Sequence, residues 1–205
     1  MKKLSLTYLI AAALACGSLF LWAAEMEDTT IDSKLTFEEA VKGSPAPDSI
    51  IKSLTLLDVE YYSFDGKLHR GQLVVSKDVA KDAREVFELI KTEKFPVAKV
   101  IPIVKFGWDD EKSMSANNTS SFCYRKVAGK KTLSRHALGR AIDINPFLNP
   151  VIYPGGRVSP KGAKRIPGNP GVFTPDSPIV KEFLKRGWRW GGMWKDPVDN
   201  HHFDK

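Results

Sequence analysis

Two apolar segments that flank Asp65-Gly66 constrain the fold of this chain more than any other feature. Residues 54–64 are rich in β-branched, leucine and aromatic side chains, and residues 68–75 repeat that character. An Asp-Gly pair between two such segments is among the strongest short-range signals for a β-hairpin. The chain is therefore expected to contain an antiparallel pair of strands at this position.

Two other segments carry apolar residues at three- and four-residue spacing, which is typical of amphipathic helices. The first helix is expected to run from Lys77 to about Glu93, with Ser76 as its N-cap. The second follows Ser177, begins with proline at its first position, and ends at Gly187. The sequence thus predicts a fold that mixes helices with strands.

Further strands are expected at residues 97–104 and 141–145, where short apolar runs recur. Two long segments lack any such pattern, namely Lys105–Lys131 and Asn145–Pro175, and the second is rich in proline and glycine. Ordered loops of this length in a compact domain usually carry function. These two loops are therefore expected to shape a binding site.

The first 24 residues have the layout of a secretory leader. Lys2 and Lys3 precede an uncharged apolar run from Leu4 to Ala24. The run is also about as long as a membrane span, and Ala-Leu-Ala-Cys ending at Cys16 is similar to a lipoprotein signal. A soluble exported protein, an uncleaved anchor and a lipid anchor stay open as alternatives. All three place the chain outside the cytoplasm, in the periplasm or cell envelope.

The rest of the chain is expected to divide into a polar arm at residues 25–48 and one domain at residues 49–205. About 180 residues remain after the leader, which is enough for one domain with a core. The formal net charge is +7, and +5 once Lys2 and Lys3 are removed, which suits anionic surroundings such as cell-wall polymer. Nucleic acid is disfavoured as a partner because the cations are dispersed. The protein is expected to be a monomer.

The residues best suited to catalysis or metal binding lie in two short segments. His136 and Asp143 are seven residues apart, and Gly139 between them permits a tight bend. The second segment, Asp199–Phe203, contains two adjacent histidines. Because Cys123 is alone outside the leader, no internal disulfide can form, and the chain has neither a cysteine pair nor a CxxC motif for a metal. Any metal here must use histidine and carboxylate.

Two histidines and one carboxylate suit a catalytic zinc site that leaves one position open for water. Zinc would lower the pKa of that water to about 7 and polarise the carbonyl of the scissile bond. A carboxylate that does not bind the metal must then move the proton, and Asp199 could fill that role. A structural histidine satisfied by a nearby aspartate is the competing interpretation of each spacing alone.

The motifs around these residues extend well beyond bare spacing. The pattern SxHxxGxAxD is met by Ser134, His136, Gly139, Ala141 and Asp143. A tryptophan- and glycine-rich stretch, Gly187–Trp194, then precedes DxxHF at Asp199–Phe203. From about Ser49 to Lys205 the chain resembles the zinc D-alanyl-D-alanine carboxypeptidase and L-alanyl-D-glutamate peptidase family, of VanY type.

The resemblance implies a small single α+β domain, with a central antiparallel sheet flanked by helices and long active-site loops. This fold agrees with the strands and helices expected from the patterns above. The resemblance also implies one Zn²⁺ per chain, held by His136, Asp143 and His202. Asp199 would be the general base.

Three further residues receive roles from the same resemblance. Arg125 would stabilise the negative charge that develops on the carbonyl oxygen, Ser134 would position the substrate, and Trp190 would line the substrate cleft. His201 stands where relatives often have an uncharged residue, so either His201 or His202 could bind the metal. The register of DxxHF favours His202.

The activity that the resemblance implies is hydrolysis of amide bonds in peptidoglycan peptides by a zinc metallopeptidase. It would act as a D-Ala-D-Ala or L,D-type carboxypeptidase, or as an L-Ala-D-Glu endopeptidase. A non-catalytic wall-binding domain on the same fold and a zinc amidase for another amide are the alternatives. The biological role stays open among recycling, remodelling, resistance and lysis.

Overall fold

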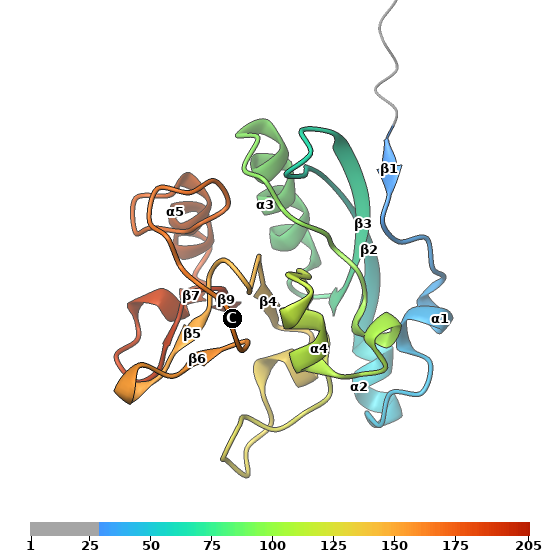
Figure 1. Cartoon of the computed structure of the whole chain (residues 1–205). Helices are drawn as coiled ribbons and strands as arrows, with labels where there is room; N and C mark the ends of the chain where they lie inside the picture. Colours follow the sequence, from blue (N-terminus) through green and yellow to red (C-terminus); the bar gives the residue numbers. More distant parts are fainter. Residues whose placement is uncertain (1–28) are drawn as a thin grey trace, which may run out of the picture.

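The largest sheet of the computed structural model is a long hairpin, as the Asp65-Gly66 signal predicts. The structure describes residues 29–205, so the expected leader and Cys16 lie outside the described residues. Strands β2 (Leu54–Tyr62) and β3 (Leu68–Ser76) pair antiparallel along their full length. Helix α3 (Ala80–Thr92) lies against this hairpin (Figure 1).

The main core forms where α3 packs on the hairpin. Ala83, Val86, Phe87 and Ile90 of the helix are buried, and they belong to one cluster with the inward side chains of β2 and β3. The helix begins at Ala80 rather than at the predicted Lys77, and Ser76 does not cap it. The reason is that Ser76 is still part of β3, where its N–H donates to the carbonyl of Gly139.

The remaining strands form two further three-stranded sheets, with orders β4–β9–β7 and β6–β5–β8. Their bounds are β4 Ala141–Asp143, β5 Val151–Ile152, β6 Val158–Ser159, β7 Arg189–Trp190, β8 Val198–Asp199 and β9 His202–Asp204. Helix α5 (Pro178–Lys185) covers the β4–β9–β7 sheet through Phe183, which stacks on Phe203 at a centroid distance of 4.1 Å. The fold is a small single α+β domain, as expected.

Ordered structure begins well before the predicted boundary at Ser49. Strand β1 (Thr30–Ile31) pairs parallel with β3, and helix α1 (Phe37–Val41) carries a complete capping box at Thr36. Helix α2 (Asp48–Ser53) follows, and Ala40 is buried in a second cluster with Leu54. The expected polar arm therefore packs on the outer face of the hairpin (Figure 1).

Residues 97–104 do not form the predicted strand. Val100 makes a single β-bridge to Thr119, and the chain then enters the 3₁₀ helix η1 (Ile103–Phe106) and helix α4 (Asp110–Ser115). Pro102 precedes η1 and has no N–H with which to continue a ladder. Within residues 29–205, no helix has the length and apolar character needed to cross a bilayer.

Candidate metal centre

The three predicted ligands come together from two parts of the chain. His136 lies in the 3₁₀ helix η2 (Arg135–Leu138), Asp143 ends β4, and His202 begins β9. Asp143 and His202 are direct partners across the antiparallel pair. All three side chains are buried, and one ligand atom from each lies within 4.8 Å of the others.

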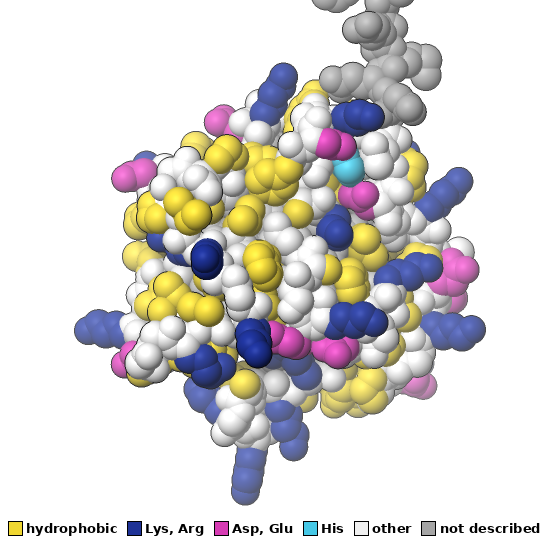
Figure 2. All heavy atoms as spheres, viewed as in Figure 1, with side chains coloured by type: hydrophobic (Ala, Val, Ile, Leu, Met, Phe, Trp, Pro, Cys, Tyr) yellow, Lys and Arg dark blue, Asp and Glu magenta, His cyan; other side chains and the backbone are white. Residues whose placement is uncertain are grey.

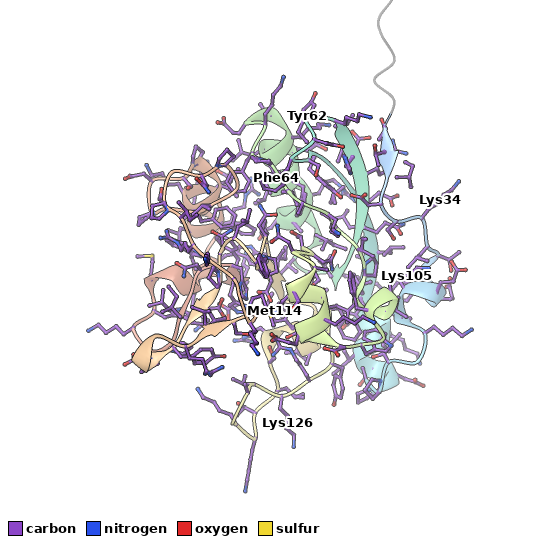
Figure 3. All side chains as sticks on the ribbon, in the orientation of Figure 1. Lys34, Tyr62, Phe64, Lys105, Met114 and Lys126 are labelled. Atoms are coloured by element: carbon purple, nitrogen blue, oxygen red, sulfur yellow. The ribbon has the colours of Figure 1, made fainter. Side chains whose placement is uncertain are left out.

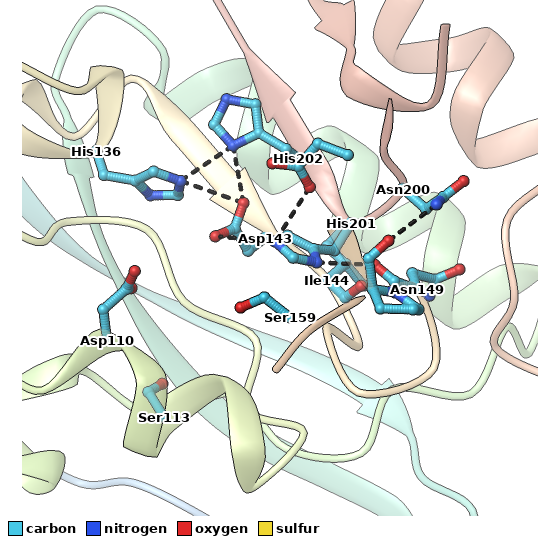
Figure 4. A network of polar contacts seen from close by, with 12 residues as sticks. Asp110, Ser113, His136, Asp143, Ile144, Asn149, Ser159, Asn200, His201 and His202 are labelled. Atoms are coloured by element: carbon cyan, nitrogen blue, oxygen red, sulfur yellow. Dashed lines mark hydrogen bonds and ion pairs between the residues drawn. The ribbon is translucent and has the colours of Figure 1, made fainter. Parts of the chain in front are cut away.

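The ligand atoms form a compact triangle (Figure 4). Nε2 of His136 lies 3.1 Å from Oδ1 of Asp143 and 3.1 Å from Nδ1 of His202, and the third edge is 2.9 Å. A tetrahedral site with zinc–ligand distances of about 2.0–2.1 Å has edges of roughly 3.3 Å. Two nitrogen donors and one carboxylate oxygen at this spacing therefore fit Zn²⁺ in both geometry and chemistry.

Neighbouring groups determine the tautomer of His136 and the ionisation state of Asp143. Nδ1–H of His136 donates to the carbonyl of Ser121 at 2.6 Å, which leaves Nε2 free for a metal. Burial alone would raise the pKa of Asp143, but the charges of His136 and His201 and the histidine hydrogen bonds hold that pKa well below its usual value. Asp143 is therefore an ionised carboxylate, as a ligand must be.

Two residues of the SxHxxGxAxD motif build the bend that brings His136 to Asp143. Oγ of Ser134 accepts the backbone N–H of His136 and so caps η2. Gly139 ends η2 with a φ of +63°, in the left-handed region. A Cβ at Gly139 would lie 2.7 Å from the backbone nitrogen of Ser76. Only glycine lets η2 approach β3 this closely.

A turn places Asp199 near the metal centre. Asp199 belongs to β8 in the third sheet, whereas His202 belongs to β9 in the second, and a turn at Asn200 and His201 connects them. Strict strand alternation would put Asp199 and His202 on opposite faces, but this turn removes the restriction. Burial would lower the pKa of His202, but hydrogen bonds to Asp143 and Asp204 raise it to about 10, and the charge of Asp199 adds to this shift.

Arg125 reaches the same region from the loop after α4. Its guanidinium forms an ion pair with Asp110 at 2.8 Å. Burial would lower the pKa of Arg125, but the charges of Asp110, Asp143 and Asp199 raise it. Asp110 thus orients Arg125, a role that the sequence did not reveal because nothing in an Asp-Asp pair distinguishes a partly buried ion pair from a solvated turn.

Two buried polar atoms at this site lack a hydrogen-bond partner. Among the described residues, the buried side-chain nitrogen and oxygen atoms without one are Nε of Arg125, Nε of Arg165 and Oδ1 of Asp199. Leaving such an atom unpaired costs about 1–3 kcal/mol. Two of the three belong to residues with predicted catalytic roles: Nε of Arg125 is an unused donor, and Oδ1 of Asp199 lacks an aligned hydrogen bond, although Nε2 of His201 lies 3.1 Å away.

The structure does not support both of the predicted substrate contacts, Trp190 and Ser134. Trp190 is only 2% exposed, and its Nε1–H donates to the carbonyl of Asn200 at 3.0 Å, so it is a core residue and its assignment to the substrate cleft is corrected. Trp194 is the more exposed tryptophan, and its ring lies 5.3 Å from that of His202. The substrate contact predicted for Ser134 stays a prediction, because Oγ of Ser134 accepts its hydrogen bond from the backbone N–H of His136.

Cys123 is not a nucleophile. Its side chain is buried, and burial raises the pKa of its thiol to about 12. At neutral pH the thiol is therefore protonated, and Cys123 is a packing residue.

A family model described as D-alanyl-D-alanine carboxypeptidase matches residues 128–205. This segment is less than half of the chain, but it contains His136, Asp143, Asp199 and His202. None of the curated proteins and none of the solved structures gives a significant match. The family match supports the resemblance to the VanY-type metallopeptidases that the motifs predicted.

Proposed function

We propose that this protein is a zinc-dependent peptidase that hydrolyses an amide bond in peptidoglycan peptides. The observation that carries the proposal is the buried triangle of His136, Asp143 and His202, with edges of 2.9–3.1 Å. A histidine paired with one aspartate for structural reasons needs no second imidazole at the same oxygen. Three convergent donors are what a cation requires.

Each of the site residues has a separate role in the proposed hydrolysis. His136, Asp143 and His202 would hold the ion, which when bound lowers the pKa of a water molecule and polarises a carbonyl group. Asp199 takes the proton of the attacking water and delivers it to the leaving amine. Arg125 supplies positive charge beside the carbonyl oxygen as negative charge develops there.

Two polar atoms of this site support an amide as the substrate. Nε of Arg125 needs an acceptor, and Oδ1 of Asp199 has no aligned hydrogen bond, although Nε2 of His201 lies 3.1 Å from it. An amide bond presents both, because its N–H donates and its C=O accepts. A substrate amide bound in this site would therefore form hydrogen bonds with both of these buried atoms.

The test is digestion of purified muropeptides by the zinc-loaded protein, with products identified by mass spectrometry. Asp199→Asn keeps the shape of the side chain but cannot accept a proton, so we expect one zinc per chain and a turnover reduced by about 100-fold or more. Asp176→Asn is the matched control, because the side chain of Asp176 is 94% exposed, and its activity should equal that of the wild type. Full activity of Asp199→Asn would refute the assigned base.

The masses of the products also separate the alternatives. Release of a single terminal residue identifies a carboxypeptidase, and cleavage inside the stem peptide identifies an endopeptidase. Binding of muropeptides by the zinc-loaded protein without any product identifies a wall-binding domain instead.

We also propose that the protein is exported and acts in the cell envelope. The proposal rests on the leader pattern of residues 1–24. Fractionation of cells that produce the full chain tests it, and Cys16→Ser distinguishes a lipid anchor from a soluble form. Recovery of the full-length chain in the cytoplasm would contradict export.

A further inference from the structure

His201 lies buried beside the metal centre without belonging to the ligand triangle. Its side chain is 2% exposed, and it projects from the turn between β8 and β9 (Figure 4). The adjacent His202 points its Nδ1 to Oδ1 of Asp143, whereas Nε2 of His201 lies 3.7 Å from the other oxygen, Oδ2. His201 therefore approaches the site from the side away from the ligand atoms.

One edge of the His201 ring is fixed by the backbone. Nδ1–H donates to the carbonyl of Asn149 at 2.7 Å. Asn149 is itself immobilised, because its side chain donates to the carbonyl of Gly171 at 2.9 Å and accepts the N–H of Phe173 at 2.8 Å. The orientation of the imidazole is therefore set by the loop after β4.

The opposite edge of the ring faces Asp199. Nε2 of His201 lies 3.1 Å from Oδ1 of Asp199, the buried oxygen that has no aligned hydrogen bond. Among the described residues, His201 is the histidine whose ring lies within hydrogen-bond distance of Asp199.

We propose that His201 is a positioning residue for Asp199. It holds Oδ1 through the 3.1 Å contact with Nε2 and thereby fixes the direction of the carboxylate relative to the metal centre. A histidine that served only as packing would not need two polar partners on opposite edges of a buried ring. The proposal rests on the proposed function, in which Asp199 moves the proton.

Two substitutions of His201 distinguish the contact with Asn149 from the contact with Asp199, because each keeps only one of them. In His201→Gln, the side-chain amide reaches the position of Nε2 and can still donate to Asp199, but the bond to Asn149 is lost. In His201→Asn, the shorter amide replaces Nδ1 and keeps the bond to Asn149, but it cannot reach Asp199. His201 is not one of the three predicted ligands, so both variants should still bind one zinc per chain.

We expect the Asn variant to lose about 10- to 100-fold in kcat, the usual range for residues that orient catalytic groups, with little change in KM. The Gln variant should retain most of the wild-type kcat. The inference is overturned if the Asn variant keeps the wild-type kcat, or if both variants lose activity equally.

Imidazole NMR of the zinc-loaded protein provides a readout that does not depend on turnover. The Nε2–H signal of His201 should be seen in the wild type and should weaken or shift in Asp199→Asn, while the Nδ1–H signal stays. A spectrum that Asp199→Asn leaves unchanged would contradict the contact between His201 and Asp199, and this measurement tests the inference if the His201→Asn variant does not fold. If Asp199→Asn is fully active, the proposed function fails; if it is inactive but His201→Asn is not, only this inference fails.

Discussion

Gly139 has the backbone conformation on which the metal centre depends most directly. It sits in the left-handed region between two predicted ligands, and a side chain there would meet Ser76 and Leu54 of the hairpin. Any side chain at Gly139 would therefore suffer both backbone strain and steric overlap. The spacing of His136 and Asp143 follows from this residue as much as from the ligands themselves.

Gly139→Ala should destabilise the protein by more than the cost of a left-handed alanine, which is about 1–2 kcal/mol. The additional loss comes from the overlap with β3, and it should be accompanied by weaker zinc binding because η2 must move. Gly66→Ala is the matched control: Gly66 has a φ of +78°, but nothing lies within 4 Å of a Cβ there. Urea unfolding and zinc content of both variants test this, and equal losses of stability would contradict the close approach.

At the scale of elements, the position of Asp199 depends on the short helix that packs against its strand. The 3₁₀ helix η4 (Gly191–Met193) packs directly on β8. A Cβ at Gly191 would lie 2.5 Å from the carbonyl oxygen of Asp199. The glycine-rich stretch before DxxHF therefore positions the strand that carries Asp199, which is a structural reason for glycine at this position.

Gly191→Ala should displace β8 and lower kcat by about tenfold or more, because a displacement of 1 Å at a catalytic group can cost about 100-fold. Zinc content should stay at one per chain, since β9 is held independently by β4 and β7. Turnover and zinc analysis of the purified variant check this. Loss of zinc together with activity would show that β8 and β9 move as one unit.

At the scale of the whole molecule, the charge is divided unequally. Residues 112–175 contain eleven Lys and Arg but one acid, Asp143. The net charge of +10 in this segment exceeds the +7 of the whole chain, so the rest of the protein is net negative. Part of the excess lies on an exposed loop at residues 126–133, which projects at the lower edge of the molecule (Figures 2 and 3). Because its base joins Arg125 to Ser134, this positively charged loop begins beside the candidate site.

This asymmetry should make cleavage of anionic muropeptides sensitive to salt. Increasing the ionic strength from about 0.01 to 0.15 M shortens the Debye length from roughly 30 to 8 Å, so kcat/KM should fall several-fold. A variant with Lys126, Lys130 and Lys131 all changed to Gln should lose most of that dependence. An amidated, uncharged peptide is the control substrate, and identical salt slopes for the two substrates would rule out electrostatic attraction by the loop.

The sequence by itself determined those parts of the protein that are encoded locally. The hairpin, helix α5 and the buried faces of α3 follow from periodicity and turn residues, because these patterns act within a few residues. The proximity of His136 to Asp143 is also local, since one bend at Gly139 brings them together.

Only the tertiary structure decided the contacts that join distant segments. His202 lies opposite Asp143 because β4 and β9 pair in one register. The burial of Trp190, the ion pair of Asp110 with Arg125 and the place of His201 likewise depend on packing. Such contacts are selected by the summed burial of the whole core, which no short sequence pattern records.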